Sequence, residues 1–225
     1  MVTQAKPVHF GRRQRKMHDK QSRIFEAAAA LFAEHGFDRV TTQQISDRAD
    51  IAAGTLFRYA ATKGELLLMV YNEELRTALA DGAAAARTQT DAVEAVTALL
   101  RPLLRAAEQR PENTIVYQRE LLFGSPTDTY RSEGLALVAG LESMIAERLI
   151  AHARRDGIGT PPGDETASAR WEEQARLAGR SIFAVLHLAL VQPSTGAHPG
   201  HDAMADLRAQ IAQIIAGFFT SQGRQ

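Results

Sequence analysis

Residues 41–67, TTQQISDRADIAAGTLFRYAATKGELL, decide the fold class of this chain. Thr41 and Gln44 have the spacing of a capping box, in which two side chains satisfy free amides in the first turn of a helix. Thr62 and Glu65 repeat that spacing ahead of a longer segment of apolar periodicity. The first box therefore predicts a short helix, and the second predicts the start of a long one.

A tight turn separates the first of these helices from a further short helix over residues 54–60. Asp50 and Ile51 interrupt the helical pattern at this turn. A longer helix from about Asp19 to Gly36 precedes both, because apolar residues recur there at the helical period. Two short helices that are joined by a tight turn and preceded by a longer helix predict a helix-turn-helix.

The remainder of the chain also carries apolar residues at the helical period, and no run alternates as a half-buried strand does. Further helices are expected over approximately residues 91–110, 111–124, 127–155, 166–192 and 202–220. We therefore predict an all-α fold with an N-terminal three-helix helix-turn-helix head and a larger helical bundle. The predicted organisation is a mobile basic arm over residues 1–18, the head over 19–64 and the bundle over 65–225, with loops at 156–165 and 193–200.

Composition excludes several classes of protein. The 225 residues are 45% hydrophobic and 23% charged, which is typical of a folded globular chain. The absence of cysteine excludes disulfide scaffolds, zinc fingers, iron–sulfur sites and cysteine nucleophiles. The longest strongly apolar stretch, residues 182–191, is too short to span a membrane, and no apolar segment follows the charged N-terminus as it does in a secretory signal. We expect a cytoplasmic protein without a membrane partner.

Charge is segregated along the chain although the formal net charge is zero. Residues 1–63 contain 11 basic and 6 acidic side chains, and the rest of the chain carries the compensating acidic excess. This asymmetry indicates that the N-terminal quarter meets a polyanion.

The sequence GTLFRY at residues 54–59, followed by Thr62 and Lys63, resembles the DNA-binding domain of the TetR family of transcriptional regulators. The resemblance covers about residues 20–68 and lies in register with the predicted helix boundaries. It implies a homodimer that binds a double-stranded, near-palindromic DNA operator and whose divergent helical body takes a small-molecule effector. The expected function is that of a repressor that its effector releases from the operator.

Residue chemistry selects the candidate DNA contacts. A hydroxyl or an amide in the first turn of a helix can meet a phosphate oxygen, and Gly54 lets its helix approach a groove closely. Thr55 can bond a base edge, and Ala53 can touch a thymine methyl group. The candidate DNA-binding residues are Thr42, Gln43, Ala53, Gly54, Thr55, Arg58, Tyr59 and Lys63. The residues expected in the core of the head are Ile45, Leu56, Phe57 and Leu66.

Four positions depart from the pattern of the family. Asp50 stands where glycine is usual in the turn, and aspartate tolerates the left-handed conformation better than most residues. Ala52 stands where a serine often caps the recognition helix, a loss of about 1 kcal/mol. Phe57 lacks the hydroxyl of the tyrosine that is common there, and Ala60 replaces a phenylalanine. These changes weaken the expected phosphate contacts, which the basic residues between 12 and 23 can offset.

The middle helices are expected to enclose an apolar pocket, because Pro102 kinks the helix that it interrupts and opens the packing around it. The candidate ligand-binding residues are Leu99, Leu103, Tyr117, Glu120, Leu121, Met144, Arg148 and Phe183. Among them Tyr117, Glu120 and Arg148 are the polar groups that would orient a mainly apolar effector. The helix that begins near Lys63 is expected to carry ligand-induced motion to the head.

No cofactor, metal ion or enzyme activity is expected. His198 and His201 offer too few ligands for a metal site, and the sequence contains no catalytic constellation. His187 lies in a mostly apolar helix, and we interpret it as a packed histidine rather than a ligand contact. The alternative function is a constitutive architectural DNA-binding protein without an effector, although the long helical body has no further basic clusters.

The last two helices carry apolar residues on more faces than one packed side requires. Phe183 and Leu190 lie off the main stripe of the first of these helices, and Ile211 and Ile215 belong to the surplus on the second. Such helices either lie at the centre of their domain or also face a partner subunit. The resemblance to the TetR family favours the second alternative and implies that these two helices form the homodimer interface.

Overall fold

The computed structural model describes residues 12–157, 165–196 and 198–220. Across these residues the protein has nine α-helices and no strand, which confirms the predicted all-α fold. The chain divides into two compact units, Met1–Val70 and Tyr71–Gln225. Within the described ranges, no helix has the length and apolar character that crossing a membrane requires.

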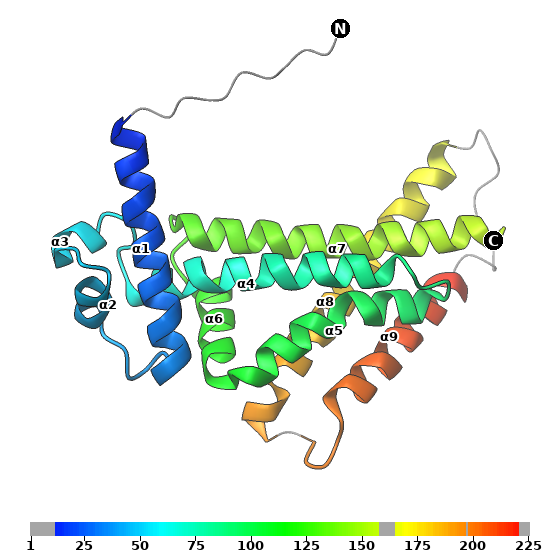
Figure 1. The fold of residues 1–225 in the computed structure, drawn as a ribbon. Coiled ribbons are helices and arrows are strands. Elements are labelled where there is room, and N and C mark those ends of the chain that lie inside the picture. Colours follow the sequence, from blue (N-terminus) through cyan, green and yellow to red (C-terminus); the bar gives the residue numbers. More distant parts are fainter. Residues whose placement is uncertain (1–11, 158–164, 197, 221–225) are drawn as a thin grey trace, which may run out of the picture. The chain divides into compact units, whose positions relative to one another are not determined.

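The first unit is a small helical head. Its helices are α1 (Arg12–His35), α2 (Thr42–Arg48), α3 (Ala53–Leu56) and the start of α4 (Lys63–Ala86) (Figure 1). The short helix α2 packs against both α1 and α3. This arrangement is the predicted helix-turn-helix with its preceding longer helix.

A capping box opens α2, as the sequence predicts, whereas at α4 only half of the predicted box forms and Glu65 bonds the residue before the cap. The Gln44 amide donates to Thr41 Oγ1 over 3.2 Å, while the Thr41 amide donates to Gln44 Oε1 over 2.8 Å. At α4 the Glu65 amide donates to Thr62 Oγ1 over 3.0 Å, and the Glu65 carboxylate accepts from the Ala61 amide over 2.6 Å. These side chains satisfy amides that have no partner within their helix.

The core of the head is apolar. Gly36 ends α1 in the left-handed region with φ 77°, and Phe37 then stacks on Phe32 with 5.8 Å between the ring centroids. The fully buried side chains of this unit include Ile24, Phe32, Ile45, Leu56, Leu66 and Leu67. The core positions predicted for Ile45, Leu56 and Leu66 are therefore confirmed.

The first helix is longer than the sequence predicts. It begins at Arg12 rather than near Asp19, so the residues 12–18 that were expected in a mobile arm are helical. Arginine, glutamine, lysine and methionine fill this segment, and their high helix propensity extends the helix although it has no apolar face there. The rest of the predicted arm, residues 1–11, lies outside the described residues.

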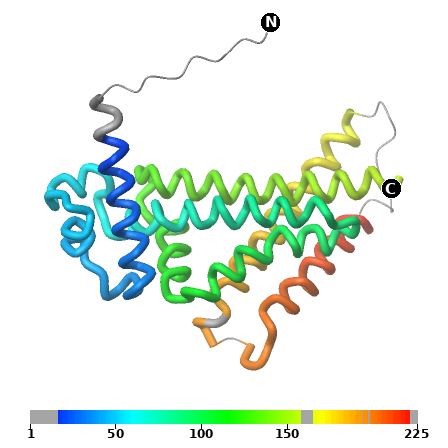
Figure 2. Tube along the Cα trace, viewed as in Figure 1, coloured from blue at the N-terminus to red at the C-terminus, as the bar shows by residue number. Residues whose placement is uncertain are grey.

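The second unit is a bundle of longer helices. It comprises the rest of α4 together with α5 (Ala92–Gln109), α6 (Pro111–Phe123), α7 (Thr129–Arg155), α8 (Glu165–Thr195) and α9 (Ala203–Thr220). Helix α7 packs against α8, and α9 packs against both α8 and α5 (Figure 2). The buried core includes Leu100, Leu104, Leu141, Ile145, Leu149, Trp171, Ile182 and Leu186.

Local chemistry sets the ends of α5 and α6. Asp91 caps α5 by accepting a hydrogen bond of 2.9 Å from the Glu94 amide. Pro111 stands in the first turn of α6, where its missing amide proton would have had no partner within the helix. The cap at Asp91 and the end of α5 just before Pro111 agree with the sequence prediction.

Helix α8 ends later than the sequence predicts. It continues through Pro193 to Thr195, which places the first residues of the predicted 193–200 turn inside the helix. Proline removes one amide but keeps its carbonyl, so a long packed helix can continue for one more turn. Most of the predicted 156–165 loop lies outside the described residues.

Two glycines bring helix backbones into direct contact. A Cβ atom at Gly82 in α4 would overlap the backbone carbonyl of Leu99 in α5. A Cβ atom at Gly179 in α8 would lie 2.6 Å from the carbonyl oxygen of Glu142 in α7. Only glycine fits at these two positions, so both helix pairs are held at a close backbone separation.

The apolar surplus of the last helices lies elsewhere than the sequence predicts. Ile211 and Ile215 are 0% and 4% exposed within the single chain, so they belong to its own core. The large apolar side chains that α8 does expose are Leu177 and Leu188, at 50% and 68%. They are about three helical turns apart and therefore lie on one face of α8.

Candidate functional site

The turn between α2 and α3 adopts a left-handed conformation at Asp50. Its φ is 51°, in a region that aspartate enters more easily than most side chains. Nη1 of Arg23 in α1 donates to the carbonyl oxygen and to Oδ2 of Asp50, over 3.3 Å in each case. The predicted survival of the turn is confirmed, and Arg23 fixes the turn to α1.

Helix α3 begins without a side-chain cap. Ala52 occupies the N-cap position and makes no capping hydrogen bond, as the sequence predicts. A Cβ atom at Gly54 would meet nothing within 4 Å, so packing within the head does not require glycine there. The missing side chain instead leaves the backbone of α3 open to a partner.

None of the eight predicted DNA-contact residues is buried. Those that are exposed are Gln43, Gly54 and Arg58, and those that are partly exposed are Thr42, Ala53, Thr55, Tyr59 and Lys63. Gln43 donates to Asp47 over 2.7 Å. The guanidinium of Arg58 has no hydrogen-bond or ion-pair partner among the residues that the structure describes, which leaves it available to an anion.

A second arginine of the head is already paired. Arg48 at the end of α2 donates to both carboxylate oxygens of Glu34 in α1, over 2.8 Å each. This two-pronged contact lowers the pKa of Glu34 through the hydrogen bond and the positive charge of Arg48. Arg48 therefore links α2 to α1, whereas the guanidinium of Arg58, directly after α3, has no partner among the described residues.

Lys63 has a structural role that the sequence did not reveal. Its Nζ donates to the carbonyl oxygens of Phe37 and Val40, over 2.8 and 2.9 Å, and lies 4.1 Å from the centroid of the Phe37 ring. The ammonium thus ties the start of α4 to the segment that follows α1. A phosphate contact by Lys63 stays a prediction, and the ammonium has one further proton to donate.

Tyr59 also has a partner within the head, because its hydroxyl donates to the carbonyl of Met17 in α1 over a long 3.4 Å.

The core position predicted for Phe57 is wrong, because 49% of this residue is exposed. Helix α3 ends at Leu56 rather than at Ala60, and Phe57 is its C-cap. The backbone then tightens, since the Arg58 and Tyr59 amides bond carbonyls three residues back. Leu56 and Ala60 fill the core, and the Phe57 ring becomes a further candidate contact surface beside Arg58.

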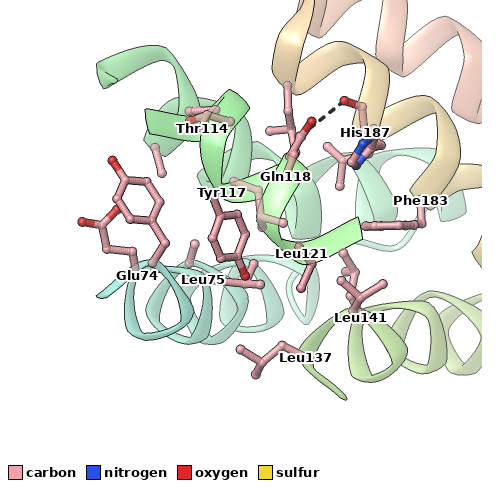
Figure 3. Close-up of a pocket in the computed structure, with 18 residues that line it drawn as sticks. Glu74, Leu75, Thr114, Tyr117, Gln118, Leu121, Leu137, Leu141, Phe183 and His187 are labelled. Carbon is pink, nitrogen blue, oxygen red and sulfur yellow. Dashed lines mark hydrogen bonds between the residues drawn. The ribbon is translucent and has the colours of Figure 1, made fainter. Parts of the chain in front are cut away.

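A cavity of about 90 Å³ lies within the second unit (Figure 3). Residues of α4, α5, α6, α7 and α8 line it. Most of the walls are aliphatic or aromatic, and they include Leu75, Ala78, Leu103, Leu121, Leu137, Leu141, Phe183, Leu186 and Leu190. The polar side chains in the lining are Tyr71, Glu74, Thr114, Tyr117, Gln118 and His187.

The cavity contains half of the residues that the sequence nominated for a ligand site. Those in its lining are Leu103, Tyr117, Leu121 and Phe183, and those outside it are Leu99, Glu120, Met144 and Arg148. Leu99 is 1% exposed in the core, and Glu120 pairs with Arg119 over 3.0 Å. The part of the lining that α5 contributes begins at Leu103, one residue after Pro102, which agrees with the expected position of the pocket near that proline.

The sequence missed the wall that α4 contributes. Tyr71, Glu74, Leu75 and Ala78 stand at intervals of three and four residues and so share one helix face. That spacing was visible in the sequence, but the same pattern is typical of ordinary core packing. His187 lines the cavity as well, which places it at the candidate ligand site rather than in the packed core.

Burial perturbs the phenols of the lining. It raises the pKa of Tyr71 to about 12 and raises the pKa of Tyr117 further still. The two rings stack with 5.7 Å between their centroids. Both hydroxyls therefore remain protonated and act as neutral hydrogen-bonding groups.

The two other titratable groups of the lining respond to burial in opposite directions. Glu74 is an exposed residue, but partial burial of its carboxyl raises the pKa of this group. The nearby positive charge of Arg110 opposes this effect. Burial lowers the pKa of His187 and so favours a neutral imidazole. Among the described residues, no group of three or more histidine, aspartate or glutamate side chains could hold a metal ion.

Comparison with known proteins identifies the head. Residues 24–70 match the family profile described as "Bacterial regulatory proteins, tetR family". The matched segment contains the capping residues of α2 and α4, the turn at Asp50 and the whole of α3.

A curated relative extends the similarity into the second unit. The HTH-type transcriptional repressor KstR of Rhodococcus jostii is 26% identical over 152 residues, which are 68% of this chain and 66% of that repressor. Alignments to the first KstR relatives span about half to two thirds of the length of those proteins.

Solved structures share the fold of both units. The FadR repressor of Thermus thermophilus, solved in complex with lauroyl-CoA, has a TM-score of 0.67 at 24% identity, over 88% of this chain and 94% of that one. FadR of Bacillus subtilis, solved in complex with stearoyl-CoA, has a TM-score of 0.60 at 18% identity, over 88% and 98%. At these identities the likeness concerns the fold.

Proposed function

We propose that this chain, which belongs to the tetR family of bacterial regulatory proteins, is a transcriptional repressor that a small, mainly apolar ligand releases from its operator. The observation that carries the proposal is the presence, in one chain, of an exposed helix-turn-helix and an apolar cavity in a separate helical unit. A regulator needs both parts, because one reads DNA and the other senses the ligand. We accordingly assign it to the cytoplasm and to regulation rather than catalysis.

DNA recognition is assigned to α2 and α3. The second helix of a helix-turn-helix places its N-terminal residues against base edges in the major groove, so Ala53, Gly54 and Thr55 would read the sequence. Thr42 and Arg58 would contact phosphates and position the head. Two heads in a homodimer fit an operator with two inverted half-sites, which is the reason for proposing a near-palindromic sequence.

Ligand sensing is assigned to the cavity. The FadR structures were solved with fatty acyl thioesters, and the chiefly apolar walls of the cavity support a ligand of that character here. Pockets for such ligands usually measure about 300–1,000 Å³. The cavity has about 90 Å³, so such a ligand must move its walls and will prefer a conformation other than the one described. A coupling of about 1–3 kcal/mol would weaken operator binding about 5- to 150-fold.

The homodimer is assigned to α8 and α9. Leu177 and Leu188 form an exposed apolar face on α8, and α9 packs beside α8 along the bundle. Burial of this face against a second copy would remove both leucines from water.

The function can be tested by selecting genomic fragments with the purified protein and then titrating the selected duplex and a random duplex at two salt concentrations. We expect selective binding that lauroyl-CoA weakens within the range given above. Equal affinity for both duplexes and no effect of lauroyl-CoA would contradict regulation and would support the architectural alternative.

A further inference from the structure

We propose that the imidazole of His187 is the hydrogen-bonding anchor for the ligand in the cavity, and that the ligand group that meets it is uncharged, as a hydroxyl, a ketone or a thioester carbonyl is. This inference rests on the proposed function and names the chemistry that its ligand site selects.

Three of the other polar side chains in the lining, Tyr117, Thr114 and Gln118, already donate hydrogen bonds within the protein. The Tyr117 hydroxyl donates to Asn72 Oδ1 over 2.9 Å, and Thr114 Oγ1 donates to a backbone carbonyl one turn earlier over 3.1 Å. Gln118 Nε2 donates to the backbone carbonyl of His187 over 3.5 Å (Figure 3). The hydroxyl protons of Tyr117 and Thr114 are therefore already in use, and these two side chains can only accept a hydrogen bond from a ligand unless the bonds within the protein break.

The His187 ring has no such partner. Across the described ranges, neither ring nitrogen makes a hydrogen bond, although the residue is only partly exposed. Its closest ring neighbour is Phe183, one turn away on α8 and also in the lining, with 5.9 Å between centroids. The ring nitrogens are not among the buried side-chain atoms that lack a partner in the described residues, so they remain accessible. Because the ring lines the cavity, it can donate or accept a hydrogen bond to a ligand there.

The charges around the cavity favour an uncharged ligand group. The lining contains no lysine or arginine, and burial lowers the pKa of His187, which favours the neutral imidazole. Glu74 adds a carboxyl to the lining, and Arg110, whose positive charge acts on Glu74, lies outside the lining. A free carboxylate would lose its water in this cavity without gaining a cation, whereas a neutral hydroxyl or carbonyl needs only the imidazole.

Two probes of equal chain length separate these cases. Binding of 1-decanol and of decanoate to the full chain is measured at pH 7 by isothermal titration calorimetry. We expect 1-decanol to bind at least tenfold more tightly. Equal affinity, or tighter binding of decanoate, would overturn the charge selectivity.

Variants of His187 test the anchor itself. His187→Phe keeps a ring but removes both nitrogens, and should weaken 1-decanol binding about 2- to 12-fold, as expected for one hydrogen bond. His187→Gln restores a neutral hydrogen-bonding group and should recover most of that loss. His201→Phe, an exposed histidine outside the lining, is the matched control and should change nothing. Unchanged 1-decanol affinity in a folded His187→Phe protein would overturn the assignment.

The outcome can be separated from that of the proposed function. Release of operator DNA by lauroyl-CoA tests the repressor, while the ratio of probe affinities and the His187 variants test the anchor. If lauroyl-CoA releases the DNA but 1-decanol does not bind, or binds with the same affinity to the His187 variants, the role assigned to His187 is wrong and the repressor function is retained. If the selected and random duplexes bind equally well and lauroyl-CoA releases neither, the repressor function fails whatever the probes do.

Discussion

The hydroxyl of Tyr117 in α6 donates a hydrogen bond to Oδ1 of Asn72 in α4, 2.9 Å away. Asn72 is only 1% exposed, and its Nδ2 donates to the carbonyl oxygen of Tyr130 in α7 over 2.7 Å. One buried amide therefore joins three helices, and one of its two partners is a wall of the cavity. A ligand that displaces Tyr117 leaves a buried oxygen without a donor, so ligand binding and helix packing are coupled at this bond.

Replacing Tyr117 by phenylalanine should destabilise the bundle. The Asn72 oxygen would be left buried and unsatisfied, which costs about 1–3 kcal/mol and should appear as a lower urea midpoint. A double-mutant cycle with Asn72→Ala isolates the bond, because the second substitution should cost less in the Tyr117→Phe background than in the wild type. Strict additivity of the two substitutions would contradict the coupling.

A pair of glycines on α7 offers a matched test of the packing beside this bond. A Cβ atom at Gly134 would lie 2.7 Å from Leu121 Cδ1 and 2.8 Å from Asn72 Oδ1, whereas one at Gly140 would meet nothing within 4 Å. Gly134→Ala should destabilise the protein by about 1–3 kcal/mol through overpacking. Gly140→Ala should stabilise it by up to about 1 kcal/mol through helix propensity. Thermal unfolding of both variants decides, and equal shifts would refute the close packing at Gly134.

Lys63 and Arg58 should separate folding from DNA binding. Lys63→Met removes two hydrogen bonds to backbone carbonyls and should destabilise the head by about 1–3 kcal/mol. Arg58→Met breaks no bond within the described protein, so its melting temperature should stay unchanged while operator affinity falls and the salt slope decreases by about one unit. Calorimetry and anisotropy titrations measure the two effects. An Arg58 variant with wild-type DNA affinity would remove this residue from the interface.

Charges on the exposed face of α8 should separate the homodimer. The double substitution Leu177→Asp with Leu188→Asp changes only exposed positions, so the protomer should remain folded while the dimer dissociates in analytical ultracentrifugation. Phe123→Asp, at an 82% exposed apolar position on α6, is the control and should leave the dimer intact. A folded double variant that stays dimeric would place the interface elsewhere.

Introducing a side-chain cap at the start of α3 should increase the stability of this helix. Ala52 makes no capping hydrogen bond, and Ala52→Ser would supply an oxygen for a free amide of the first turn, which is worth about 0.5–2 kcal/mol. We expect a higher melting temperature and tighter operator binding. Ala61→Ser, an exposed substitution outside the helix, is the control. A loss of operator affinity in the Ala52 variant would show that a small side chain is needed there.

Helix boundaries were predictable wherever a single side chain sets them. Three predicted helix starts depend on one side chain each, and the structure confirms them: Thr41, Thr62 and Asp91 accept hydrogen bonds from amides in the first turn of their helices. Pro111 was predicted to end the preceding helix, and that helix does end just before it, at Gln109. Phe57 shows the limit of such reasoning, because its exposure depends on where α3 tightens rather than on its place in a periodic pattern.

The cavity was only partly predictable, because a lining is a relation between helices far apart in the sequence. Leu103 and Phe183 were found since they follow a proline and lie off a helix stripe. Tyr71 and His187 were not predicted to line it. Periodicity identifies the buried face of a helix, but it does not show whether the neighbouring helices fill the space beside that face.

The contact at Gly82 limits where α4 can move relative to α5. Its backbone is in direct contact with that of Leu99, so separating α4 from α5 at this point would create an unfavourable cavity between the two helices. The residues 71–78 that α4 contributes to the cavity lie roughly one to three turns before this contact on the same helix. Gly82 is therefore the fixed point of α4, and the part of α4 that precedes it has more freedom to move. If a ligand moves the wall that α4 contributes to the cavity, we expect the helix to turn about Gly82, a residue outside the cavity lining and outside the head.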